Sequence, residues 1–367
     1  MKKIISAVLA SFLLTAFLSV PLCAADVSAY SAILIETSSG DVIFEKNARE
    51  KLPMASTTKI MTAVCVLENS DPDSLFTVPK EVCGIEGSSI YLKPGETLSI
   101  RQLLYAVMLE SANDAAAACA YAVSGSPSAF ADLMNQTASR IDLSDTHFTN
   151  PHGLDDEAHY TTASDLAKLM AYAMRIESFR EIVSTVEYTI PSVEGKRFLS
   201  NHNKLLKLSK DVTGGKTGFT KRSGRCLVSS AERDGVSLIA VTLNAPDDWN
   251  DHLALHELGF SSYSMVHLAE QGEFNIEIPC VSAPDGKLTL TNRDELSVCL
   301  KNNAAVETVI ESGPLLFAPV VEGDVCGHIT FTSSGKILGT LPLYASQNIA
   351  VPEENYALFD KIFDIIK

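Results

Sequence analysis

The stretch Pro53-Met54-Ala55-Ser56-Thr57-Thr58-Lys59 opens an apolar run with helical spacing, and we predict a helix over residues 56–68. Residues three apart share one face of a helix, so Lys59 is expected beside Ser56. A serine hydroxyl is a weak nucleophile until a neighbouring base takes its proton. A lysine drawn into an apolar site can lose its own proton near neutral pH and serve as that base. The stretch therefore predicts a serine–lysine pair at the start of a buried helix.

A second motif, Ser111-Ala112-Asn113, lies between two predicted helices. The first ends near Leu109, and the second is rich in alanine and continues to about Val123. At a junction of this kind the Ser111 hydroxyl and the Asn113 amide can face a cleft. We therefore expect both side chains in the same site as Ser56.

A third motif, Lys216-Thr217-Gly218, follows a pair of glycines and leads into a predicted strand. Gly218 has no side chain and lets a substrate backbone lie close to that strand. Lys216 supplies a cation and Thr217 a hydroxyl for a carboxylate. Ser-x-x-Lys and Ser-x-Asn recur at residues 333–336 and 346–348, where we expect only turns. The prediction therefore rests on the order of the three motifs rather than on any one of them.

The segments around these motifs predict an α+β fold, one of the mixed α/β classes. Residues 30–46 alternate as two strands joined at Ser39-Gly40, and residues 226–231 and 236–244 alternate as two strands joined at Asp234-Gly235. Between them, residues 163–186 have helical spacing after cap candidates at Thr161, Thr162 and Ser164. Strands at both ends with helices between them indicate one antiparallel sheet flanked by helices.

From about Gly272 the pattern changes to short alternating runs separated by Asp-Gly, Asn-Asn and Ser-Gly, which predict a small all-β domain. The expected strands are 274–278, 287–291, 296–300, 306–310, 327–331 and 338–343. The chain is thus divided into a catalytic domain at residues 26–267, a β-sandwich-like domain at 268–350 and a short amphipathic tail at 351–367.

The N-terminus of the chain indicates export, and the C-terminal tail is amphipathic. Lys2-Lys3, the apolar residues 4–20 and the small residues Cys23-Ala24-Ala25 resemble a signal peptide over residues 1–25, with an uncleaved membrane anchor as the alternative. The tail places apolar side chains on one broad face from Leu358 to Ile366. This face predicts either peripheral membrane contact or a packed terminal helix.

Composition limits the partners. The chain has 367 residues, 29 Lys+Arg and 45 Asp+Glu, and a net charge of −16. Such an acidic balance argues against binding to nucleic acid, which needs clustered cations. Seven cysteines follow Cys23 without a Cys-x-x-Cys, so no disulfide framework is expected.

Other candidates have simpler interpretations. His252 and His256 have the spacing of a metal pair on a helix, but no third ligand suggests itself, and we expect a surface or packing role for them rather than a metal. We expect a structural role for His152, with a catalytic role as the alternative. Trp249, the single tryptophan, is expected to pack rather than to stack on a substrate.

The three motifs in this order resemble those of the penicillin-recognising serine enzymes, and most closely those of the low-molecular-weight D-alanyl-D-alanine carboxypeptidases. Further stretches are also similar to that family, and together they extend the likeness over nearly the whole chain after the signal. These stretches are 149–154, 162–167, 201–205, 211–215 and 318–343.

The resemblance implies a β-lactamase/transpeptidase-like fold and a site for peptidoglycan stem peptides that end in D-Ala-D-Ala. It implies Ser56 as the acylated nucleophile, with Lys59 as its base. Ser111 and Asn113 would relay protons and hold the substrate amide, and Lys216, Thr217 and Gly218 would form the substrate-binding strand. The backbone N–H groups of Ser56 and Phe219 would bind the oxyanion. No cofactor is implied, β-lactams would acylate the same serine, and the protein would act in the cell envelope or be secreted.

One departure and three alternatives remain open at this point. Residues 245–252 lack an arginine that the family often has after the next strand, so either Lys216 and Thr217 hold the terminal carboxylate alone or Arg225 substitutes. A D,D-endopeptidase would use the same residues. A β-lactamase would need a further carboxylate, for which Asp155, Asp156 and Glu157 are candidates outside any matching motif. A non-catalytic wall-binding protein would not need the Ser56–Lys59 pair.

Overall fold

The computed structural model describes residues 26–351. The predicted signal peptide and, apart from its first residue, the amphipathic tail lie outside the described residues. A five-stranded antiparallel sheet forms the centre of the first part of the chain. Its spatial order is β2 (Val42–Lys46), β1 (Ser31–Glu36), β9 (Val236–Leu243), β8 (Gly224–Arg233) and β7 (Val212–Thr220).

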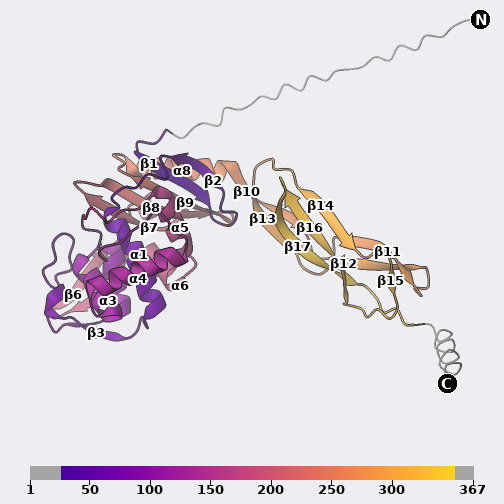
Figure 1. Ribbon diagram of the computed structural model, residues 1–367, viewed down its shortest axis with the longest axis horizontal. Helices are drawn as coiled ribbons and strands as arrows, with labels where there is room; N and C mark the ends of the chain where they lie inside the picture. Colours follow the sequence, from indigo (N-terminus) through magenta and orange to yellow (C-terminus); the bar gives the residue numbers. More distant parts are fainter. Residues whose placement is uncertain (1–25, 352–367) are drawn as a thin grey trace, which may run out of the picture.

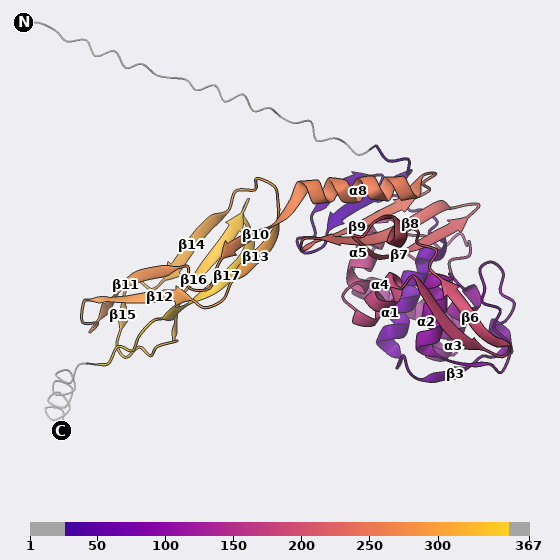
Figure 2. The same cartoon turned by 180° about the vertical axis from the view of Figure 1, so that it is seen from behind.

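Helices cover both faces of this sheet. Helix α8 (Asp248–Ser262) packs on one face and α5 (Ala163–Ala173) on the other, as Figures 1 and 2 show. Beyond α5 lies a helical cluster in which residues 59–66 of α1 are all buried, as expected for a stretch that is apolar on most of its surface. The cluster consists of α1 (Lys59–Asn69), α2 (Ile100–Leu109), α3 (Asn113–Ser124), α4 (Pro127–Arg140) and α6 (Glu177–Ser184).

Shorter elements complete this part of the chain. They are the 3-10 turns η1 (Ala55–Thr58) and η2 (Lys80–Val82), α7 (Leu205–Leu208), and the hairpin pairs β3 (Leu75–Thr77) with β4 (Thr97–Ser99) and β5 (Glu187–Ser192) with β6 (Gly195–Ser200). The helix predicted over residues 163–186 is wrong in one respect, because the chain turns at residues 174–176 and forms two helices, α5 and α6. The β5–β6 hairpin was not predicted.

The second part of the chain is all-β, and each of the six predicted runs overlaps a strand. A six-stranded sheet has the order β14 (Glu307–Ser312), β16 (Val325–Ser333), β17 (Lys336–Ala345), β12 (Lys287–Asn292), β11 (Asn275–Val281) and β15 (Leu316–Phe317). The second Ser-x-x-Lys forms the two-residue turn between β16 and β17, as predicted.

The two parts are joined where strand β10 (Tyr263–Ala269) follows helix α8, and polar contacts also link them. Strand β10 pairs with β13 (Leu296–Lys301), so the boundary expected at 267/268 falls inside a strand. Lys336 Nζ donates to the Ser39 carbonyl at 2.9 Å across this junction. Within residues 26–351, no helix is long and apolar enough to span a membrane. The seven described cysteines are free thiols.

Candidate active site

The predicted serine and lysine lie side by side at the start of α1. Ser56 is on η1 and Lys59 is the first residue of α1, and Lys59 Nζ lies 2.9 Å from Ser56 Oγ. The preceding Ala55 has φ +47°, a left-handed conformation that alanine rarely adopts. This backbone geometry places Ser56 at the edge of the fold, half-buried, while Lys59 points into the core.

Lys59 is fully buried and lies within hydrogen-bond distance of three oxygens. Besides Ser56 Oγ, its Nζ donates to Asn113 Oδ1 at 2.7 Å and to the His152 carbonyl at 2.6 Å. Burial, and then the nearby charge of Lys216, hold the pKa of Lys59 well below its ordinary value. No carboxylate is among its hydrogen-bond partners in the described chain, so this environment favours the neutral amine.

Ser111 and Asn113 lie in the junction between α2 and α3, as predicted. Ser111 has φ +58° and is buried, and its Oγ has no hydrogen-bond partner within the described residues. The Asn113 amide bridges two segments, since its Oδ1 accepts from Lys59 and its Nδ2 donates to the Glu86 carbonyl at 2.7 Å. The structure therefore brings both residues of the second motif to the Ser56–Lys59 pair.

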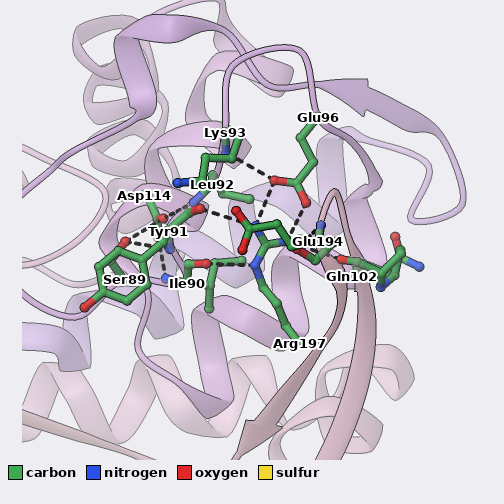
Figure 3. A network of polar contacts seen from close by, with 12 residues as sticks. Ser89, Ile90, Tyr91, Leu92, Lys93, Glu96, Gln102, Asp114, Glu194 and Arg197 are labelled. Atoms are coloured by element: carbon green, nitrogen blue, oxygen red, sulfur yellow. Dashed lines mark hydrogen bonds and ion pairs between the residues drawn. The ribbon is translucent and has the colours of Figure 1, made fainter.

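The loop at residues 88–92, which was not predicted from the sequence, forms one wall of the site. Figure 3 shows the polar contacts that hold this loop in place. The Asp114 carboxylate accepts from Ser89 Oγ at 2.7 Å and from the N–H groups of Ile90 and Leu92 at 3.2 and 3.0 Å. Arg197 on β6 donates to the Ile90 carbonyl at 2.8 Å and pairs with Glu96. Asp114 directly follows the second motif, which is the one signal that could have identified it. Arg197 lies in the unpredicted hairpin, where no signal marks it.

The third motif lies within strand β7, beside η1. Lys216 is buried, and burial lowers its pKa to about 7. Gly218 packs against η1 so closely that a Cβ at this position would be 3.0 Å from Ser56 N. The neighbouring Phe219 side chain is 67% exposed and forms part of the rim. The close approach explains why a residue without a side chain stands at 218.

A cleft of about 470 Å³ opens over these groups. Arg225 lies in it, and its Nε and Nη2 donate to Asp248 Oδ1 at 3.0 and 2.6 Å, while its guanidinium lies 5.5 Å from the centre of the Trp249 ring. Trp249 is therefore both packed and part of the cleft lining. The lining residues are Ser56, Ser88, Ser111, His202, Thr217, Gly218, Phe219, Arg225, Asp248 and Trp249.

His252 and His256 lie apart from the cleft lining, in the interface between α8 and the sheet. Both rings are buried and approach Ser229 Oγ at 2.6 and 3.0 Å, and His252 Nε2 lies 3.0 Å from Thr242 Oγ1. These contacts confirm the packing interpretation. Among the described residues, no group of three or more His, Cys, Asp or Glu side chains is arranged to hold a metal ion.

Comparison with known proteins agrees with this geometry. The family described as D-alanyl-D-alanine carboxypeptidase, peptidase family S11, matches residues 19–247. The chain belongs to this family. Its membership confirms the resemblance inferred from the three motifs, and the protein is a peptidase.

Two curated members of the D-alanyl-D-alanine carboxypeptidase family align with nearly the whole chain. D-alanyl-D-alanine carboxypeptidase DacF of Bacillus subtilis (strain 168) is 30% identical over 333 residues, which are 88% of this chain and 86% of the relative. D-alanyl-D-alanine carboxypeptidase DacC of Escherichia coli (strain K12) is 33% identical over 376 residues, covering 94% of this chain and 88% of the relative.

A solved structure confirms the fold. Penicillin binding protein 5 from Haemophilus influenzae superposes with a TM-score of 0.68 at 25% identity, covering 89% of this chain and 98% of the other. The predicted antiparallel sheet flanked by helices, with a β-rich part after it, is therefore confirmed as the architecture of the family.

Proposed function

We propose that the protein is a serine D-Ala-D-Ala carboxypeptidase that removes the terminal D-alanine from peptidoglycan stem peptides through an acyl-enzyme on Ser56. The observation that supports this most directly is the environment of Lys59 Nζ. Two of its three neighbours are carbonyl oxygens, of Asn113 and His152, and the third is the Ser56 hydroxyl. A neutral amine has two hydrogens for the two carbonyls and one lone pair for the Ser56 proton. Lys59 is thus arranged as a general base.

In the first step Ser56 Oγ attacks the carbonyl carbon of the penultimate D-alanine while its proton moves to Lys59 Nζ. The N–H groups of Ser56 and Phe219 bind the oxyanion that forms, and each such donor contributes about 3 kcal/mol to the stability of the transition state. The C–N bond then breaks. The leaving D-alanine takes up the proton through Ser111 Oγ, whose freedom from other partners within the described residues suits a relay.

In the second step a water molecule hydrolyses the ester. Lys59 Nζ takes one proton from the water, the hydroxide oxygen attacks the acyl carbon, and the proton returns to Ser56 Oγ as the C–O bond breaks. Asn113, held at Oδ1 by Lys59 and at Nδ2 by Glu86, keeps its amide fixed beside the reacting bond in both steps. A β-lactam would enter the same first step and form a long-lived ester.

For the substrate carboxylate we assign Thr217 and Arg225, with buried Lys216 supplying positive charge behind them. Thr217 and Arg225 both line the cleft. Lys216 is not one of the lining residues, and its Nζ donates to the Thr217 carbonyl at 3.0 Å. In the described residues, Arg225 uses Nε and Nη2 for Asp248, which leaves Nη1 for a ligand. Arg225 would thereby substitute for the arginine that residues 245–252 lack.

We also infer the location and division of the chain. The signal pattern at residues 1–25 supports export, and peptidoglycan as substrate supports action in the cell envelope. The apolar face of the tail supports peripheral contact with the membrane. We propose that the catalytic domain ends with α8 at Ser262, because β10 pairs with β13 of the β-rich part.

The alternatives make different demands on the site. A β-lactamase would need a carboxylate to activate water, but Asp155, Asp156 and Glu157 are exposed, and Asp155 accepts from Thr220 Oγ1 at 3.0 Å. An endopeptidase would accept a substrate without a free terminal carboxylate, which would leave Arg225 without a role. A pure binding protein has no use for a neutral lysine beside a serine.

The test is hydrolysis of diacetyl-L-lysyl-D-alanyl-D-alanine, read as release of D-alanine, with the C-terminal amide of the same peptide as the comparison substrate, read as release of D-alaninamide. The wild type should hydrolyse the free acid and not the amide, and Ser56→Ala should release no D-alanine. Ser333→Ala is the matched control, because it changes the serine of the other Ser-x-x-Lys. Turnover by Ser56→Ala would refute the nucleophile, and preference for the amide would favour the endopeptidase.

A further inference from the structure

A row of buried polar groups lies behind Ser56, on the side away from the cleft. The Thr149 N–H donates to His159 Nδ1 at 3.0 Å, His159 Nε2 lies 2.7 Å from Thr58 Oγ1, and Thr58 Oγ1 donates to the Ala55 carbonyl at 2.7 Å. Thr58 and His159 are 0% and 3% exposed, and neither lines the cleft. They are 101 residues apart in the chain, so the row joins η1 to the segment before α5.

The direction of each hydrogen bond follows from the first one. Because His159 Nδ1 accepts from a backbone N–H, the ring proton of neutral His159 is on Nε2. Nε2–H then donates to Thr58 Oγ1, which leaves the Thr58 hydroxyl hydrogen for the Ala55 carbonyl. Burial keeps the ring neutral by lowering its pKa to about 4. All the donors in the row therefore point toward Ala55 O.

Ala55 O and the N–H of Ser56 belong to the same peptide unit. A trans peptide is planar and its C=O and N–H point in opposite directions, so fixing the oxygen also fixes the direction of the N–H. The nitrogen side faces strand β7, since a Cβ on Gly218 would be 3.0 Å from Ser56 N. The oxygen side faces Gly153, where a Cβ would be 2.0 Å from Ala55 O. The peptide is thus held between two glycines and aimed by Thr58.

This peptide needs outside support because of its backbone conformation. Ala55 has φ +47°, and such a conformation in a residue other than glycine persists only where its surroundings impose it. The hydrogen bond from Thr58 provides such a constraint. A donor on the oxygen of a peptide also polarises its N–H and makes that N–H a better donor itself.

We propose that Thr58 and His159 are positioning residues that aim and polarise the Ser56 N–H toward the oxyanion. The inference rests on the proposed function, in which that N–H binds the oxyanion of the acylation transition state. Neither residue touches the substrate. Their effect should therefore fall on the rate of the chemical step and not on the binding that precedes it.

The experiment measures the acylation rate constant and the dissociation constant of the preceding complex separately, with benzylpenicillin in a rapid-quench mass assay. Thr58→Val removes the hydroxyl and keeps the shape, and we expect acylation about tenfold slower with the dissociation constant unchanged. Thr58→Ser restores the hydroxyl and should return the rate to within about twofold of the wild type. The matched control is Thr137→Val, because Thr137 is similarly buried and its hydroxyl contacts only Cys65 Sγ in the described residues.

Acylation of Thr58→Val at the wild-type rate, or equal slowing by Thr137→Val, would overturn the positioning role. Failure of Thr58→Ser to rescue the rate would do the same. If Thr58→Val does not fold, His159→Leu provides a second measurement, since it removes the donor to Thr58 and should also slow acylation without weakening binding. Failure of the proposed acyl-enzyme on Ser56 is recognised separately, because the wild type itself would then not be acylated, and failure of the carboxypeptidase activity is recognised from the peptide substrates.

Discussion

Replacement of Gly218 by alanine tests how closely strand β7 and the oxyanion site are fitted. The added Cβ would lie 3.0 Å from Ser56 N and 3.1 Å from Met54 O, where ordinary contact begins at 3.4 Å. The strand and η1 must therefore separate by about 0.4 Å, the difference between the ordinary 3.4 Å and the 3.0 Å to Ser56 N. The backbone at 218 is open to alanine, since its φ is outside the left-handed region.

The expected loss is a fraction of one oxyanion donor. One such donor contributes about 3 kcal/mol, and a shift of this size should cost about 1–2 kcal/mol of it. Acylation by a fluorescent penicillin should thus be about five- to thirty-fold slower in Gly218→Ala. The melting temperature should change little, because a displacement of a few tenths of an ångström is enough to accommodate the alanine methyl.

Gly214→Ala on the same strand is the matched control. Its Cβ would lie 2.4 Å from Val183 Cγ2 of helix α6, away from η1. It should cost about 1–3 kcal/mol of stability and leave the acylation rate of the folded protein unchanged. Acylation of Gly218→Ala at the wild-type rate, or equal slowing in both variants, would refute the reasoning.

Three further changes have defined outcomes. Arg225→Gln should raise KM for the free-acid peptide about tenfold with kcat nearly unchanged, whereas Arg233→Gln, outside the cleft, should not; steady-state kinetics decide this. Asp114→Asn should loosen residues 89–92, and a normal acylation rate with unchanged protease resistance of that loop would contradict the role we give it. Burial lowers the pKa of His256 from 6.5 to about 4, so on acidification the unfolded chain binds a proton at this ring before the folded chain does. The contribution of neutral His256 to the free energy of unfolding is therefore fully present above pH 6.5, and it should decline by about 3 kcal/mol as the pH falls toward 4. His256→Gln should reduce this decline in urea unfolding at pH 7.5 and 4.5, and exposed His267→Gln should not.

Local chemistry made much of the fold predictable. Asp234-Gly235 and Ser334-Gly335 both have positive φ at both residues, as two-residue hairpin turns require, and both turns could be placed from the sequence. The pair Ser56–Lys59 was predictable for a similar reason, because residues three apart on a helical turn are neighbours whatever the rest of the chain does.

Features that depend on distant contacts could not be predicted. The break between α5 and α6 contains no glycine or proline, so the helical spacing on either side continues through it without a signal. The roles of Arg197 and His159 depend on partners about 100 residues away, Glu96 and Thr58. Alternation and capping describe a residue and its neighbours, and they carry no information about which loop a side chain will meet.

The central claim is that Ser56 is the nucleophile and that Lys59 activates it. The most direct measurement is the intact mass of residues 26–367, for the wild type and Ser56→Ala, after brief incubation with benzylpenicillin. The account predicts a persistent increase of one penicillin in the wild type and none in Ser56→Ala. An adduct on Ser56→Ala, or a wild type that leaves the drug intact and gains no mass, would contradict it.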